Sequence, residues 1–523
     1  MATPLVLALM GLFYLVIGTS SERCTFDKIS PSQTLTWCPR NEGFFCARLD
    51  PAQSNSSFGA YQGMILLNPG GPGVSGVGEA LDNASTIQAV VGTNWDIVGF
   101  DPRGMWLSEP VADCSANITS DQVITLRSKT VPRVTDDFYN SFIQFGKDLG
   151  GRCEKTTGGE KDAGPHMSTA TTARDMLSIV NAFAETEDGE RAAKPNHLLH
   201  FYRVSYGTFL SQTFASMFPE SVGNVVLDGV MSPESYLTNY TSESVNHLDG
   251  IIAAFFIYCH KAGPADCSYY TGSTPKDIYE RFNRSFVQLD PRKAEADNWS
   301  NATDLETALL VLKVGLLSTA NEPFSYFGLL PQTLVDLESA LSTQHISPWA
   351  EQAMTIFGDP RTAGYEHPEW SLAVLCSDQN NTPQLEEIEH QSIIGEIWIK
   401  SALGCTGWPI KATEIFTGPF GGDTAIPILF VGNTHDPVTP IDNALSSAPH
   451  YPNSQVLTVD GMGHTTIATR NTCGLSKISA YFQTGKLPGN KSFCPLEQGP
   501  FGIVLNGTLK ENIIRAGFSG LVD

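Results

Sequence analysis

Short apolar runs of strand length recur along this chain and are separated by helical patterns such as residues 171–183. Parallel strands need long crossover connections of this kind, whereas antiparallel strands can be joined by tight turns. The alternation therefore predicts an α/β fold with a mostly parallel sheet and right-handed crossovers. The apolar runs cover residues 64–67, 96–100, 198–204, 223–227, 426–431 and 455–459.

The middle of the chain has a different character. Amphipathic helical runs dominate between residues 232 and 411, and no strong strand pattern occurs there. At 523 residues the chain also exceeds what one hydrophobic core usually holds. We therefore expect a core in two parts, 21–231 and 412–523, with a helical cap inserted at 232–411. The helical runs are Val245 to His260, Leu305 to Leu317 and Gln332 to Ser342.

Ser205 lies at the end of an apolar run and is followed by a helical pattern rich in small residues. A serine on such a strand-turn-helix elbow has its hydroxyl exposed, and the usual pattern is G-x-S-x-G. Here Gly207 supplies the second glycine, but Arg203 replaces the first. Because S-x-G alone is common, the prediction that Ser205 is a nucleophile also requires an acid and a histidine in the right chain order.

Asp436 and His464 each follow a predicted strand further along the chain. The order Ser205, Asp436, His464 is the order of the triad in α/β-hydrolases. In that arrangement Ser205 attacks a carbonyl carbon, His464 moves the proton, and Asp436 orients the imidazole. Two simpler interpretations remain open, since Asp436 before Pro437 is also typical of a turn and His464 among glycines is also typical of a surface loop.

A glycine-rich loop follows the first apolar run, at residues 68–76. Its bare backbone can approach a ligand and present N–H groups. Hydrolases of this kind combine one such N–H with that of the residue after the nucleophile to form an oxyanion hole. We therefore predict that Gly71 and Tyr206 provide the oxyanion hole. A flexible turn is the alternative, although two prolines stiffen this loop.

Several motifs together resemble one known group. The chain is similar to the secreted tripeptidyl aminopeptidases and prolyl aminopeptidases, and residues from about Thr424 to Cys494 resemble the C-terminal domain of the tripeptidyl branch. The resemblance implies an α/β-hydrolase fold with a helical cap between the nucleophile and acid segments. It also implies an exopeptidase that removes short peptides or single residues from free N-termini through an acyl-enzyme on Ser205. The motifs are Asn68 to Gly73, Trp95 to Gly104, Val204 to Thr208, Leu227 to Val230, His435 to Pro440 and Gly461 to His464.

Two residues depart from the pattern of that group. Arg203 stands where the group has Gly, and a guanidinium there must reach solvent or pair with a carboxylate. Pro69 stands where the prolyl aminopeptidases have His, although the tripeptidyl branch resembles this sequence more closely.

An aminopeptidase must hold a protonated α-amino group, which calls for a carboxylate in the pocket. Asp378 matches a motif of the resembling group and is the first candidate, with Glu234 and Asp228 as weaker ones. The alternative is that Asp378 caps a turn beside a disulfide. Asp101 and Arg103 are expected to form a structural ion pair that shapes their loop.

Residues 2–18 form an apolar stretch that is too short to favour a membrane span, and residues 1–20 are predicted to be a signal peptide. The C-terminal residues carry no lipid-anchor signal. Together with many glycosylation sequons, this leader predicts a secreted, extracellular glycoprotein. The sequons are at Asn55, Asn83, Asn117, Asn239, Asn283, Asn298, Asn301, Asn380, Asn490 and Asn506.

Eleven cysteines in an exported chain predict disulfides rather than metal sites, because paired C-x-x-C units are lacking. Pairing by proximity leaves Cys24 over. It joins Cys38 with Cys46, Cys114 with Cys153, Cys259 with Cys267, Cys376 with Cys405, and Cys473 with Cys494.

The net charge of −23 argues against nucleic acid or an anionic membrane as a partner, since both require basic patches. We expect no metal and no organic cofactor, because the serine mechanism needs neither and the histidines lack ligand spacing. The expected partner is a peptide or small acyl substrate.

Three hypotheses follow. The first is a secreted serine aminopeptidase, and the second is an esterase, lactonase or other small-acyl hydrolase with the same triad. The third is a glycoprotein that keeps the fold without catalysis. A carboxylate in the cap pocket would favour the first hypothesis, and an apolar pocket the second. A missing hydrogen bond between Ser205 and His464 would favour the third.

Overall fold

A computed structural model gives the arrangement of most of the chain. It describes residues 38–39, 45–48, 60–68, 70–114, 137–238, 247–291, 294, 299, 302–358, 368–379, 392–394 and 404–521. The predicted signal peptide and Cys24 lie outside these residues.

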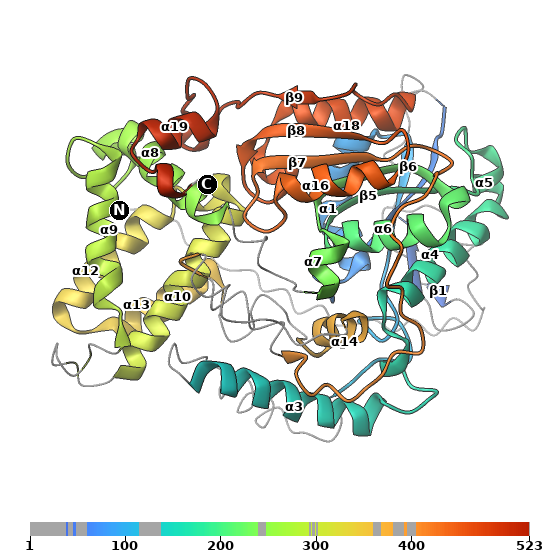
Figure 1. The fold of residues 1–523 in the computed structure, drawn as a ribbon, viewed down its shortest axis with the longest axis horizontal. Coiled ribbons are helices and arrows are strands. Elements are labelled where there is room, and N and C mark those ends of the chain that lie inside the picture. The colour runs from blue at the N-terminus through green and yellow to red at the C-terminus, as the bar shows by residue number, and fades with distance from the viewer. Residues whose placement is uncertain are drawn as a thin grey trace, which may run out of the picture.

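A single twisted sheet forms the centre of the described structure (Figure 1), with strand order β1-β2-β4-β3-β5-β6-β7-β8-β9. The seven strands β3 to β9 all run parallel to one another. At one side of the sheet, β2 pairs antiparallel with β4, and β1 pairs antiparallel with β2. This sheet confirms the predicted α/β-hydrolase fold class. The strands are β1 Cys38–Pro39, β2 Phe45–Arg48, β3 Gly63–Leu67, β4 Trp95–Phe100, β5 Leu199–Ser205, β6 Val222–Val230, β7 Leu429–His435, β8 Gln455–Met462 and β9 Ser492–Cys494.

Helices cover both faces of the sheet because neighbouring residues of each buried strand point to opposite sides. In β3, Leu66 belongs to one apolar cluster, whereas Ile65 and Leu67 belong to another. The Leu66 side is covered by α3 Asp137–Thr157, α4 Thr169–Ala184, α6 Tyr206–Met217 and α16 Ile441–Ser447. The opposite side is covered by α1 Gly76–Val91 and α18 Thr472–Thr484.

A group of helices beside the sheet has a hydrophobic core of its own, to which Phe255, Leu316, Leu334 and Trp349 contribute. Figure 1 shows this group at the left of the view. The middle of the chain is therefore helical, as its amphipathic runs predict. The helices are α8 Leu248–Asp266, α9 Pro275–Gln288, α10 Ala302–Asn321, α11 Pro323–Tyr326, α12 Leu330–Thr343 and α13 Ile346–Phe357.

The packing differs from the expected domain boundaries in two places. Helix α14, Pro368–Asp378, lies within the expected cap segment, but its Trp370 and Val374 pack into the core of the sheet. Helix α19, Leu509–Arg515, lies within the expected core segment, but it packs with α8 in the helical group. Their buried apolar residues thus place α14 with the sheet and α19 with the helical group, although their positions in the chain suggest the reverse.

Four of the predicted disulfides are present: Cys114–Cys153, Cys259–Cys267, Cys376–Cys405 and Cys473–Cys494. For the fifth pair, the antiparallel register of β1 and β2 places Cys38 opposite Cys46, and the bond itself stays a prediction. Within the described residues, no helix combines the length and apolar character that crossing a bilayer requires.

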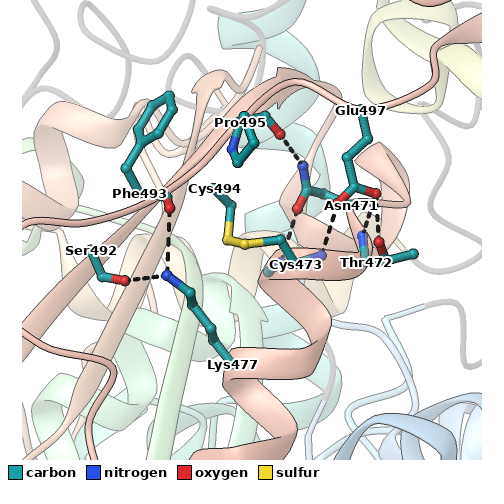
Figure 2. Close-up of a disulfide and its surroundings, with 10 residues drawn as sticks. Asn471, Thr472, Cys473, Lys477, Ser492, Phe493, Cys494, Pro495 and Glu497 are labelled. Atoms are coloured by element: carbon teal, nitrogen blue, oxygen red, sulfur yellow. Dashed lines mark hydrogen bonds between the residues drawn. A yellow bond between two sulfur atoms is a disulfide. The ribbon is translucent and has the colours of Figure 1, made fainter.

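The Cys473–Cys494 disulfide fastens the edge strand β9 to α18 (Figure 2). Hydrogen bonds around it act in the same direction, since Lys477 on α18 donates to Ser492 Oγ at 2.6 Å. Glu497 accepts the N–H of Thr472 at 2.9 Å and that of Cys473 at 3.0 Å. β9 pairs with β8 through only three residues, so these covalent and polar links add to its attachment to the sheet.

Candidate active site

Ser205 is the last residue of β5, and Tyr206 begins α6. The serine has φ 55° and ψ −131°, a strained conformation for a residue with a side chain. The glycine loop after β3 lies against it, because a Cβ on Gly70 would come within 2.9 Å of Ser205 Cβ. The structure thus brings together the elbow and the loop that were predicted to share a site.

Arg203 does not reach solvent. Its side chain is 1% exposed and pairs with Glu79 of α1 at 3.2 Å. It also donates to the carbonyl oxygens of Asn68 and Leu66 and lies over the ring of Phe201. Burial lowers its pKa, and the Glu79 carboxylate opposes that shift. The residue that replaces the elbow glycine therefore links the nucleophile strand to the start of the glycine loop.

Asp436 and His464 form the best-defined polar contact of the site. His464 Nδ1 lies 3.0 Å from Asp436 Oδ1 and 3.1 Å from Oδ2. Asp436 is fully buried and accepts the N–H groups of Val438 at 2.9 Å and Thr439 at 2.8 Å. Burial favours its neutral form, but His464 and these donors outweigh burial and lower its pKa. The carboxylate therefore begins a turn and also orients a histidine.

The His464 loop is fixed at its backbone. Its N–H donates to the carbonyl of Asn321 in the helical group at 2.9 Å. Burial alone would lower the pKa of His464, but the carboxylates of Asp436, Asp228 and Glu322 raise it above its ordinary value. The imidazole is thus poised to accept a proton.

Ser205 and His464 are both described, and no hydrogen bond joins them in this structure. In hydrolases without bound substrate this bond is often long or poorly aligned and tightens only in the reacting complex. The assignment of Ser205 to the triad therefore rests on chain order and on the conformation of the elbow, and it stays a prediction.

Gly71 follows Gly70, the loop residue that lies against Ser205, and Tyr206 follows Ser205 in the chain. Gly71 has φ 114°, which a residue with a side chain rarely adopts. Tyr206 is the first residue of α6, where backbone N–H groups lack helical partners. Both positions suit a donor to an oxyanion, and their role stays a prediction. Pro69 lies outside the described residues.

Asp378 is buried and already fully engaged with neighbouring side chains. Thr169 donates to it through its N–H at 2.9 Å and its hydroxyl at 2.5 Å, and the Tyr236 hydroxyl donates at 3.0 Å. Burial raises the pKa of Asp378 to about 6. Asp378 thus lies beside the N-terminus of α4 instead of capping a turn, and its amine-binding role stays a prediction.

The two weaker carboxylate candidates differ in exposure. Glu234 is exposed on α7, Pro233–Thr238, which follows the carboxyl end of β6. Asp228 is completely buried, with a pKa that burial raises to about 6. It accepts hydrogen bonds from Tyr202 and from Thr466, two residues after His464. Asp228 therefore supports the histidine loop, and its amine-binding role, like that of Glu234, stays a prediction.

The expected ion pair between Asp101 and Arg103 is wrong. Arg103 instead pairs with Asp175 of α4 through two contacts of 2.6 Å. Asp101 accepts from Ser75 Oγ at 2.6 Å and from the N–H of Val77 at 3.2 Å. Asp101 and Arg103 are close in sequence, but Asp101 binds residues at the start of α1 and Arg103 binds a residue of α4.

Four of the predicted glycosylation sites, Asn83, Asn283, Asn490 and Asn506, lie among the described residues and are exposed. The other six, Asn55, Asn117, Asn239, Asn298, Asn301 and Asn380, lie outside them. Exposure permits modification, which stays a prediction. No three His, Cys, Asp or Glu side chains gather as metal ligands would in the described part of the chain.

Sequence reasoning missed Thr169, Thr439 and Ser371. Thr439 Oγ1 lies 3.0 Å from Asp436 Oδ2 and 3.2 Å from His464 Nδ1. Ser371 Oγ donates to the carbonyl of Pro72 in the glycine loop at 2.6 Å. A hydroxyl residue at such a position has no distinctive spacing, and only the folded arrangement singles it out.

The chain is a serine hydrolase of the α/β-hydrolase fold. Residues 391–494 match the model of the TAP-like protein family. The chain is 25% identical over 458 residues to serine protease Hip1 of Mycobacterium tuberculosis (H37Rv), covering 83% of this chain and 81% of that protein. It is 25% identical over 446 residues to the tripeptidyl aminopeptidase of Streptomyces lividans, covering 83% and 77%. Carboxylesterase B of M. tuberculosis is also 25% identical, over 447 residues, covering 83% and 80%.

These likenesses confirm the predicted resemblance to the tripeptidyl aminopeptidase group. The relatives cover most of the chain, and the family match over residues 391–494 includes Asp436 and His464.

Proposed function

We propose that this protein is an exported serine aminopeptidase that cleaves short peptides or single residues from free N-termini. Ser205 is the nucleophile, His464 the general base and acid, and Asp436 the residue that orients His464. The N–H groups of Gly71 and Tyr206 stabilise the oxyanion. The observation that carries the proposal is the contact of His464 with buried Asp436, combined with the strained elbow at Ser205.

The proposed reaction has two halves. His464 Nε2 takes the proton of Ser205 Oγ as the oxygen attacks the carbonyl carbon, and then returns it to the leaving amine. Water hydrolyses the resulting acyl-enzyme by the same route. Asp436 stays ionised throughout and stabilises the imidazolium, which its lowered pKa supports.

Peptide substrates are supported by two of the relatives, which are named serine protease and tripeptidyl aminopeptidase. Carboxylesterase B, with equal identity and similar coverage, supports an ester or other small-acyl substrate as the second candidate. The missing Ser205–His464 hydrogen bond is what the non-catalytic hypothesis expects.

A panel of three substrates tests these candidates: a free-amine tripeptide anilide, its N-blocked form and a short acyl ester. Secreted wild type and Ser205→Ala are compared, with Ser377→Ala as a folded control. Turnover of the free-amine anilide that Ser205→Ala abolishes supports the aminopeptidase. Ester turnover alone supports the second candidate, and an inert wild type contradicts both.

Export is proposed from the apolar leader, the sequons and the four disulfides. The mass of the protein recovered from the medium of secreting eukaryotic cells tests it. The expected protein lacks residues 1–20 and loses mass on enzymatic deglycosylation, whereas an intracellular, unmodified chain would contradict the proposal.

A further inference from the structure

One side of helix α14 is joined by hydrogen bonds to the glycine loop and, through Thr169, to Tyr206. Ser371 and Asp378 are two helical turns apart, which places them on the same face, about 10 Å apart along the axis. In Figure 1, α14 lies below α7, away from the helical group. Neither residue touches Ser205, Asp436 or His464 through any hydrogen bond among those of the described residues.

Ser371 holds the glycine loop. Its hydroxyl donates to the carbonyl of Pro72 at 2.6 Å. The next residue, Gly73, lies so close that a Cβ on it would come within 2.5 Å of Ser371 Oγ and 3.0 Å of its backbone nitrogen. The loop also receives a hydrogen bond from Trp106 Nε1 to the carbonyl of Gly73 at 3.1 Å, and Trp106 contacts Trp370 of α14. Helix α14 thus contacts the loop at Pro72 and Gly73, the two residues that follow Gly71.

Asp378 holds the elbow from the other side. It accepts both polar hydrogens of Thr169, whose hydroxyl lies 2.5 Å from the Tyr206 hydroxyl. Tyr206 is buried, so this chain of hydrogen bonds fixes the ring of the residue whose N–H is the second donor. A buried polar network of this kind rigidifies its members when each is satisfied.

We propose that α14 sets the separation between the two oxyanion donors, with Ser371 placing Gly71 and Asp378 placing Tyr206 through Thr169. Both are positioning residues. The Cys376–Cys405 disulfide anchors the end of α14 that carries Asp378. The inference rests on the proposed function and assigns Asp378 a role distinct from binding the substrate amine.

The two roles of Asp378 predict different kinetics. A residue that binds the amine acts only on free-amine substrates, mainly through KM. A residue that positions an oxyanion donor acts on every acyl substrate and on phosphonylation, through kcat, because the donor is used in the transition state.

The test measures kcat, KM and the rate of inactivation by a fluorophosphonate for Ser371→Ala, Asp378→Asn and Thr169→Val. Substrates are the free-amine tripeptide anilide and the short acyl ester. Ser377→Ala is the matched control, because Ser377 is a buried serine on α14 whose hydroxyl has no hydrogen-bond partner in the part of the chain that the structure describes. Tyr206→Phe removes the hydroxyl at the far end of the network and retains the N–H.

In Ser371→Ala, Asp378→Asn and Thr169→Val, we expect kcat to fall by roughly 10- to 100-fold on both substrates. This loss is smaller than the ~10²- to 10³-fold loss that follows removal of a whole oxyanion donor. KM should change little, phosphonylation should slow in parallel, and Ser377→Ala should stay within twofold of wild type. Thr169→Val and Asp378→Asn should be non-additive with Tyr206→Phe, since they break one network.

Other outcomes overturn the inference. If Ser371→Ala has the same kcat as the control Ser377→Ala, Ser371 does not position the glycine loop. A loss in Asp378→Asn confined to free-amine substrates, with normal ester turnover, would assign Asp378 to amine binding. If Asp378→Asn fails to fold, Thr169→Val and Tyr206→Phe decide in its place. An inert wild type would contradict the proposed function itself, and the inference with it.

Discussion

His464 Nδ1 lies within hydrogen-bond distance of both oxygens of Asp436, at 3.0 and 3.1 Å, and the carboxylate is completely buried. Asp436→Asn keeps the shape but removes the charge that orients the imidazole and stabilises its protonated form. We expect kcat to fall by about 10⁴-fold. Steady-state kinetics on any substrate of the wild type check this.

Because Asp436 accepts several N–H groups, thermal unfolding of Asp436→Asn serves as the control for folding. Activity within tenfold of wild type in a folded variant would contradict the proposed role of Asp436.

The pH dependence of activity follows from His464. Its pKa is raised above 6.5, and the general base must be neutral, so kcat/KM should rise with pH through an inflection above 6.5. Glu322 is one of the carboxylates that raise this pKa, and it is exposed on the helical group. Glu322→Gln should therefore move the inflection to lower pH.

Glu351→Gln removes an exposed carboxylate of the same helical group, on α13, and is the matched control. High salt should reduce the difference between Glu322→Gln and wild type, since exposed charges are screened. An inflection below 6.5 in wild type would show that His464 is not the titrating base.

The Arg203–Glu79 pair makes a prediction about stability. Arg203 is 1% exposed and Glu79 is 17% exposed, so Glu79→Gln leaves a buried cation without its partner. We expect the free energy of unfolding to fall by about 3 kcal/mol. Urea unfolding measures it, with Glu154→Gln as the control, because Glu154 is an exposed residue of α3. Equal midpoints for the two variants would mean that the carbonyls of Asn68 and Leu66 satisfy Arg203 on their own.

The edge strand β9 depends on its disulfide. Cys473 and Cys494 are 21 residues apart, and closing a loop of this length contributes about 3 kcal/mol. The double variant Cys473→Ser/Cys494→Ser should lose about that much in urea unfolding. Lys477→Gln, which removes the ammonium that donates to Ser492 Oγ and to the carbonyl of Phe493, should lose only about 1 kcal/mol. An unchanged midpoint in the double variant would contradict this account.

The sequence was sufficient to predict the parts of the molecule that local pattern determines. Six strands were predictable because buried parallel strands are continuous apolar runs, and Ser205, Asp436 and His464 each follow one of them. The strands β1, β2 and β9 are too short to produce such a pattern.

Contacts between distant segments were not predictable in the same way. Arg103 pairs with Asp175, 72 residues away, and not with Asp101, because tertiary packing decides which carboxylate is near. Thr169 and Asp378 are 209 residues apart, so nothing in either local sequence announces their contact. Helix α14 was expected in the cap because of its place in the chain, but its apolar residues are buried against the sheet.

The most direct test of the central claim is to identify the residue that a fluorophosphonate modifies. Wild type is treated with the probe and digested, and the modified peptide is sequenced by mass spectrometry, with Ser205→Ala and His464→Ala treated in parallel. We predict a single adduct on Ser205, none in Ser205→Ala, and a much slower reaction in His464→Ala. A folded wild type that forms no adduct, or forms it on another residue, would contradict the assignment of Ser205 as the nucleophile.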